Sequence, residues 1–109
     1  MSVQLDHAII PVRDKRAAAE LLGYLLEVPW AESGAGPFSP VYVNDGLTLD
    51  FDQAEGSYPV QHYCFRVSEE EFDGIMARIR ARGIEYRSTP HGPVDKHATR
   101  WTNRVLERA

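Results

Sequence analysis

A repeat in the sequence, spaced by 54 to 55 residues, limits the folds open to this chain more than any other feature. His7 and His62 each lie within a stretch that alternates like a β-strand, 55 residues apart. A helix then begins at a capping residue in each copy, Asp14 in the first and Ser68 in the second, 54 residues apart. The spacing of 54 also relates three apolar helix positions of the first copy to three of the second: Leu21, Leu22 and Leu25 to Ile75, Met76 and Ile79. Strand, cap and helix positions that repeat together predict two copies of one supersecondary unit.

The first copy, residues 1–54, has the pattern of a βαβββ unit. The expected elements are strands at 3–12, 30–32, 38–43 and Leu47–Gln53, with a helix over Lys15–Leu26. Pro11 cannot donate to a strand ladder, so the first strand is expected at a sheet edge or near its end there. Asn44, Asp45 and Gly46 tolerate positive φ and predict a hairpin between the last two strands.

The second copy, residues 55–109, begins in the same way and ends early. A strand is expected at 58–67, and a helix over 69–82 starts at the capping box of Ser68 and Glu71 and stops at Gly83. These elements, with the first copy, predict a single α+β domain of paired βαβββ-type units, with helices on the outer face, a cleft within, and the second unit incomplete.

The C-terminal part of the second copy leaves alternatives open. A short strand is expected at 84–87, followed by a loop. Residues 94–109 fit either a short helix from Ala98 or a final strand around 104–107, and we favour a loop that ends in a strand.

Composition restricts the partners of the chain. A formal charge of −4 and a pI near 5.5 argue against nucleic acid. No apolar stretch approaches the ~18–20 residues of a membrane span, and we expect no signal peptide. The single cysteine, Cys64, forms no internal disulfide, which fits a reducing compartment, so we expect a cytoplasmic protein.

The repeat has a chemical consequence. Two equivalent strands would bring His7 and His62 close together across a pseudo-twofold axis, and Asp50 lies on the polar face of the strand Leu47–Gln53. Two imidazoles and a carboxylate suit a divalent ion: Fe, Mn, Zn or Ni. The alternative is that each histidine is a packed residue and that Asp50 is solvated.

Three further residues are candidates for substrate binding. Cys64 and Arg66 share the polar face of the expected strand 58–67 with His62. Arg66 would hold an anionic group or a surface carboxylate, and Cys64 would contribute a small side chain, since it is too far from His62 for a nucleophile pair. Trp30 would line the rim of the cleft or pack against the sheet.

Three segments, LDHAIIPVRD, LTLDF and QHYCFRVSEEEFD, resemble the vicinal-oxygen-chelate superfamily, the glyoxalase, bleomycin-resistance and extradiol-dioxygenase group. The resemblance spans residues 3–92 and implies a cupped mixed or antiparallel sheet around a metal site. It implies that His7 and His62 match the first-strand and fifth-strand histidine ligands, and that Asp50 stands where many members have Glu. It also implies a homodimer.

The C-terminus departs from the pattern of that superfamily. The carboxylate segment of the last strand is missing, and WTNRVLERA matches the preceding strand, which implies a truncated or altered C-terminus. The other alignment places this segment on the last strand and makes Glu107 a ligand.

The resemblance implies a metal-dependent glyoxalase or dioxygenase-type enzyme that chelates vicinal oxygens of a small organic substrate. A non-catalytic binding protein of the antibiotic-sequestering, bleomycin-resistance kind is the alternative. A third hypothesis is a remnant that folds only as an intertwined dimer.

Overall fold

The first part of the chain forms a three-stranded sheet with one helix beside it. The computed structural model describes residues 2–59 and 61–86 and divides the chain into two compact units, Met1–Gln61 and His62–Ala109. The elements of the first unit follow in this order: β1 (His7–Val12), α1 (Lys15–Leu26), β2 (Ser39–Asn44) and β3 (Leu47–Gln53).

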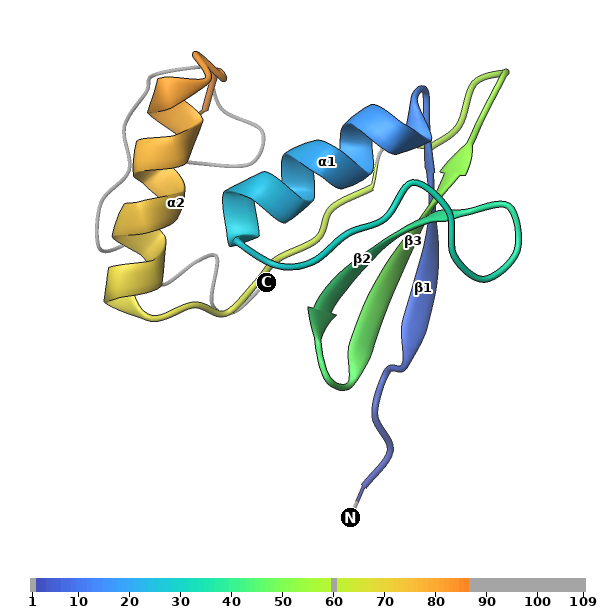
Figure 1. The fold of residues 1–109 in the computed structure, drawn as a ribbon, viewed down its shortest axis with the longest axis horizontal. Coiled ribbons are helices and arrows are strands. Elements are labelled where there is room, and N and C mark those ends of the chain that lie inside the picture. Colours follow the sequence, from blue (N-terminus) through green and yellow to red (C-terminus); the bar gives the residue numbers. More distant parts are fainter. Residues whose placement is uncertain (1, 60, 87–109) are drawn as a thin grey trace. The chain divides into compact units, whose positions relative to one another are not determined.

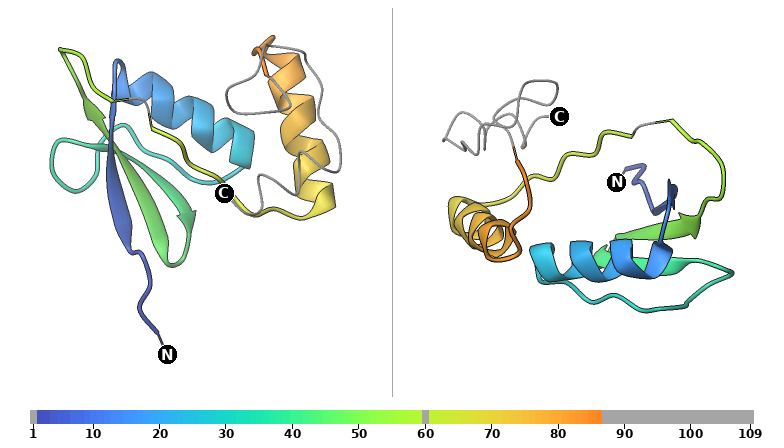
Figure 2. Two further views of the ribbon diagram at one scale, coloured as in Figure 1. Left: turned by 180° about the vertical axis from the view of Figure 1, so that it is seen from behind. Right: turned by 90° about the horizontal axis from the view of Figure 1, so that it is seen from above.

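β3 is the central strand of this sheet, parallel to β1 and antiparallel to β2 (Figure 1). The parallel pair requires a crossover, which α1 supplies. Figure 2 shows α1 beside the strands from two further directions. The result is a mixed βαββ sheet, which corresponds to most of the predicted βαβββ unit.

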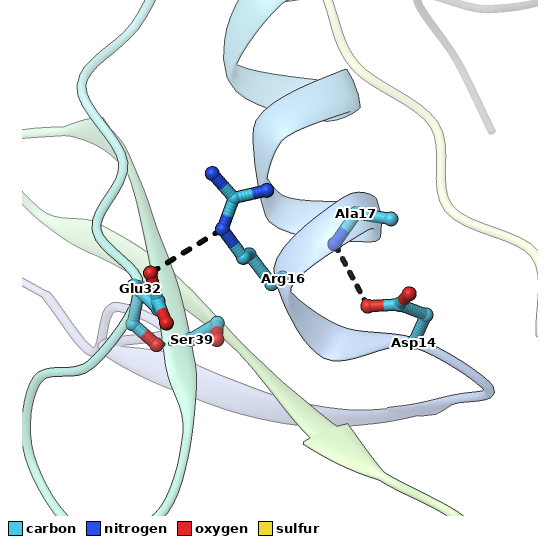
Figure 3. Close-up of polar contacts among 5 residues, drawn as sticks. All are labelled: Asp14, Arg16, Ala17, Glu32 and Ser39. Atoms are coloured by element: carbon cyan, nitrogen blue, oxygen red, sulfur yellow. Dashed lines mark hydrogen bonds and ion pairs between the residues drawn. The ribbon is translucent and has the colours of Figure 1, made fainter.

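Local signals set the ends of these elements. The Asp14 carboxylate accepts a hydrogen bond from the backbone N–H of Ala17 at 3.0 Å, which caps α1 (Figure 3). The hairpin between β2 and β3 is closed by Asn44, whose side-chain oxygen accepts from the N–H of Gly46 at 2.8 Å. β1 pairs only with β3 within the described residues, so Pro11 lies on an edge strand, as expected.

The core of the first unit lies between α1 and one face of the sheet. Alternating residues of the three strands supply it: Ile10, Val41, Leu49 and Phe51. On α1 the buried residues are Ala19 and Gly23, one turn apart, whereas the predicted leucine stripe is half-buried. Small residues replace leucines there because Trp30 lies close to α1, and a Cβ added at Gly23 would lie 2.6 Å from its Cδ1 atom.

Two strand predictions in the first unit need correction. The strand expected at 3–12 begins only at His7. The strand expected at 30–32 is a single bridge between Trp30 and Val41. Pro29 precedes that bridge and lacks a donor N–H, and a glycine-containing loop follows at 33–37, so the pairing does not extend in either direction.

The second unit contains the helix α2 (Glu69–Ala81). The predicted capping box is present: the Ser68 N–H donates to the Glu71 carboxylate at 2.8 Å, and the Glu71 N–H donates to the Ser68 hydroxyl at 3.0 Å. Gly83 has a φ of +66° just after the helix, as a terminating glycine should. Phe72 and Met76 are buried, which confirms the apolar side of α2.

The strand predicted at 58–67 is not confirmed, because none of its described residues belongs to a strand. The same correction applies to residues 84–86 of the short strand predicted at 84–87. A strand exists only through hydrogen bonds to a neighbouring strand, which an alternating pattern does not supply. The alternatives for 94–109 lie outside the described residues. No helix in the described ranges is both long and apolar enough to cross a membrane.

Candidate functional site

The face of the sheet opposite α1 carries most of the polar side chains of the strands. Residues that are paired across neighbouring strands point to the same face. Two rows across β1, β3 and β2 therefore share this open face: His7, Thr48 and Tyr42, then Ile9, Asp50 and Pro40. The register thus places a predicted histidine ligand and the predicted carboxylate ligand in adjacent rows of one surface.

A pocket of about 230 Å³ lies on this open face. All three strands and the loop 33–37 contribute to its wall, and its lining residues are Asp6, His7, Ala35, Pro40, Tyr42, Thr48 and Asp50. This pocket brings together His7 and Asp50, two of the predicted metal ligands.

Asp50 is the most unusual member of the pocket. Its exposure is only 7%, although it carries a carboxylate. Within residues 2–59 and 61–86 no hydrogen bond or ion pair holds its side chain. Burial of a carboxylate without a direct hydrogen bond is costly, and the charge of Asp50 acts on His7 in the same pocket.

His7 lies at the mouth of the pocket with its ring orientation fixed by its neighbour. Its Nδ1 lies 2.8 Å from the Asp6 carboxylate and donates to it. This hydrogen bond raises the pKa of His7 above 6.5, and the negative charges of Asp6 and Asp50 act in the same direction, against the opposing effect of desolvation. A proton held on Nδ1 leaves the lone pair of Nε2 available to a ligand, the arrangement that metal-binding histidines use.

The loop 33–37 closes one side of the pocket and is anchored at both ends. Before the loop, the backbone carbonyl of Glu32 accepts a hydrogen bond from the Ser39 hydroxyl at 2.6 Å. The side-chain carboxylate of Glu32 forms an ion pair with Arg16 at 3.3 Å (Figure 3). After it, the Lys15 ammonium donates to the carbonyl of Pro37. Gly34 lets the loop approach β2, since a Cβ there would lie 2.8 Å from Pro40 Cγ.

The other predicted site residues lie elsewhere. His62, Cys64 and Arg66 precede α2 in the second unit, where Cys64 is half-buried and the other two are exposed. The approach of His62 to His7 therefore stays a prediction. Glu107 lies outside the described residues.

Trp30 is not among the residues that line the pocket. It lies against Gly23 of α1, and the Arg16 guanidinium stacks 5.7 Å from its ring centroid. Trp30 thus has a packing role, but its side chain contacts α1, whereas the sequence alternative was packing against the sheet.

Sequence reasoning did not single out Asp6, Tyr42 or Thr48. Thr48 shares the polar side of β3 with Asp50, and Asp6 adjoins His7, so the alternation and the neighbouring position were usable signals. Tyr42 could be found only from its pairing with Thr48, which depends on the register of two strands.

The described residues do not by themselves complete a metal site. No group of three His, Cys, Asp or Glu side chains gathers there closely enough to hold an ion. His7 and Asp50 supply two donors of the type that transition metals use, so the first unit fits part of the predicted ligand set.

Comparisons with solved structures place this geometry in a known group. The oxidase ChaP-H2 is 41% identical, with a TM-score of 0.77 over 84% of this chain and 71% of its own. The oxidase ChaP-H1 is 38% identical, with a TM-score of 0.74 over 82% of this chain and 71% of its own. A structure described as a possible glyoxalase from Bacillus cereus is 29% identical, with a TM-score of 0.54 over 75% of this chain and 76% of its own.

No protein-family model and no curated protein matches the chain. The similarity to the two oxidases nevertheless extends over more than two thirds of each chain. Together with the glyoxalase-like neighbour, it supports the vicinal-oxygen-chelate fold that the sequence resembles. This chain belongs to the vicinal-oxygen-chelate family that includes the ChaP-H oxidases.

Proposed function

We propose that this chain is a metal-dependent enzyme that oxidises a small organic substrate through two adjacent oxygen atoms. One observation carries the proposal: the buried carboxylate of Asp50 has no partner in the described residues and lies in one pocket with His7. A divalent cation would offset the cost of burying that charge. The oxidase activity named for two relatives supports oxidation over the isomerase or lyase chemistry that the same fold can host.

The proposed ligands are His7 and Asp50 from the first unit and His62 from the second, with Glu107 as a weaker candidate. When bound, the ion would polarise two adjacent oxygens of the substrate and supply one-electron chemistry. Among the expected metals, this role favours Fe or Mn over Zn²⁺, which has no redox chemistry.

The chain itself prepares the site. Asp6 accepts the Nδ1 proton of His7, which keeps one tautomer and one ring orientation. Ala35 of the loop 33–37 and the apolar ring of Pro40 line the pocket beside Asp50. These residues would hold the ligands ready before the substrate enters.

Uptake of dioxygen tests the proposal. The full chain would be loaded anaerobically with Fe(II) at pH 8, where proton competition for His7 is reduced, and then given a panel of catechols and α-hydroxyketones. We expect metal-dependent oxygen consumption that Asp50→Asn abolishes. Asp52→Asn, two residues along the same face of β3, is the matched control and should stay active.

Other outcomes would replace the proposal with its alternatives. Turnover in a glyoxalase assay without oxygen uptake would point to lyase or isomerase chemistry. Tight binding of bleomycin-type antibiotics without any turnover would point to a sequestering protein.

A further inference from the structure

Tyr42 differs from its neighbours on β2. Pro40 and Val41 are buried, whereas Tyr42 is 42% exposed and lines the pocket on the open face of the sheet. Its partner in the antiparallel ladder is Thr48, and Thr48 is paired in turn with His7. One row across the sheet therefore carries a phenol, a hydroxyl and an imidazole.

The two hydroxyls of this row have no partner of their own. In the part of the chain that the structure describes, neither Tyr42 nor Thr48 uses its side-chain hydroxyl in a hydrogen bond. A pocket that faces two uncommitted hydroxyls is suited to a ligand with oxygen atoms.

The loop 33–37 limits the space above Tyr42. A Cβ added at Gly34 would lie 3.4 Å from the Tyr42 hydroxyl oxygen, and Ala35 lines the same pocket. The volume of about 230 Å³ is smaller than the ~300–1,000 Å³ of sites for drug-sized ligands. The pyrrolidine ring of Pro40 and the aromatic ring of Tyr42 provide apolar surfaces in its wall. These features suit one planar ring that carries oxygen substituents.

We infer that Tyr42 and Thr48 are the substrate-selecting residues of this site and that their hydroxyls bind the oxygen atoms of a small, planar, vicinally oxygenated ring. The inference rests on the proposed function and adds the residues that recognise the substrate, apart from those that hold the metal. In this arrangement His7 and Asp50 would hold the ion, and Thr48 and Tyr42, in the same row as His7, would bind the organic ligand.

Anaerobic calorimetric titration with catechol, a simple ring with two adjacent hydroxyls, tests this assignment on the full chain. Tyr42→Phe keeps the ring and removes only the hydroxyl, and Thr48→Val removes the other one. We expect each variant to weaken catechol binding about three- to tenfold, the effect of one neutral hydrogen bond. Metal content, measured on the same samples, should be unchanged in both variants.

Tyr24→Phe is the matched control, because Tyr24 lies on α1, which packs on the other face of the sheet. Its catechol affinity should equal that of the native chain. Circular dichroism verifies that each variant is folded, and Thr48→Val keeps the test decisive if Tyr42→Phe does not fold.

The result has a clear reading for each proposal. If the catechol affinity of both variants stays within twofold of the native affinity, the role of the two hydroxyls is overturned. It is also overturned if the native chain binds no catechol. A native chain that holds no metal, yet binds catechol more weakly in both variants, refutes the metal-dependent function and leaves the role of Tyr42 and Thr48 supported.

Discussion

Replacement of Asp50 by asparagine should make the metal-free protein more stable and the metal-loaded protein less stable than the native one. Asp50 is 7% exposed and makes no hydrogen bond or ion pair within the described residues, so its carboxylate is buried without a direct partner. An unpaired buried ion costs several kcal/mol, whereas an unsatisfied neutral amide costs about 1–3 kcal/mol. Asp50→Asn should therefore gain about 1–2 kcal/mol in the absence of metal.

The order reverses when metal is present. A ligand at 100 times its Kd stabilises the native state by about 2.7 kcal/mol, and the variant should gain almost none of this. The native protein should then be ahead by about 1 kcal/mol. In chelator, where no metal is bound and the variant is the more stable protein, it should melt about 4–10 °C higher than the native chain.

Thermal unfolding followed by circular dichroism at pH 8 measures the stability of the metal-free protein in EDTA and of the metal-loaded protein in excess Mn²⁺. Asp52→Asn is the control for the loss of one charge on β3. Two results would refute the reasoning. A variant that is less stable in EDTA would show that Asp50 has a structural partner. An equal response of the native chain and the variant to Mn²⁺ would show that Asp50 is not a ligand.

Three further predictions concern the two helices and the assembly. Gly23→Ala should lower the melting temperature, because overpacking against Trp30 costs about 1–3 kcal/mol and outweighs the ~1 kcal/mol gain in helix propensity. Gly74→Ala is the control: its Cβ would meet only the flexible end of an arginine, so this variant should have a higher melting temperature than the native chain. Ser68→Ala should cost about 1 kcal/mol at neutral pH. The hydrogen bonds from the Ser68 N–H and hydroxyl lower the pKa of Glu71, so the stabilisation that the Glu71 carboxylate adds is present above its unfolded pKa and is lost as the pH falls through the folded one. The difference in melting temperature between the native chain and Glu71→Ala should therefore shrink as the pH falls below 4.5, and a constant difference would contradict the capping box. Sedimentation analysis of the full chain should show the homodimer that the sequence resemblance implies, and a monomer at all concentrations would exclude it.

Elements that depend on local signals were predictable from the sequence. The bounds of α1 and β3 agree with the prediction because Asp14 caps the helix and Asn44 closes the hairpin within a few residues of each element. The start of α2 at the capping box of Ser68 follows from the same kind of short-range contact.

Elements that depend on distant partners were not predictable in this way. Residues 58–67 alternate as clearly as β3 does, but alternation determines only which side chains share a face. Membership of a sheet depends on a hydrogen-bonded neighbour, and the bridge at Trp30 shows how one proline and one glycine-containing loop limit such pairing to a single residue.

The site shows the same division between local and distant information. The sequence placed Asp50 on the polar face of its strand, but it could not distinguish a solvated carboxylate from a buried one. Burial depends on neighbours from other parts of the chain, among them Pro40, which is paired with Asp50 across the sheet. Tyr42 became visible only through the register of β2 against β3.

The metal content of the purified full chain tests the central claim most directly. After anaerobic loading with Fe(II) or Mn²⁺ and removal of free ions, elemental analysis should find close to one ion per chain in the native protein. Asp50→Asn and His62→Ala should retain almost none, while Asp52→Asn should match the native content. A native chain without metal, or variants that hold as much as the native chain, would contradict the metal site proposed here.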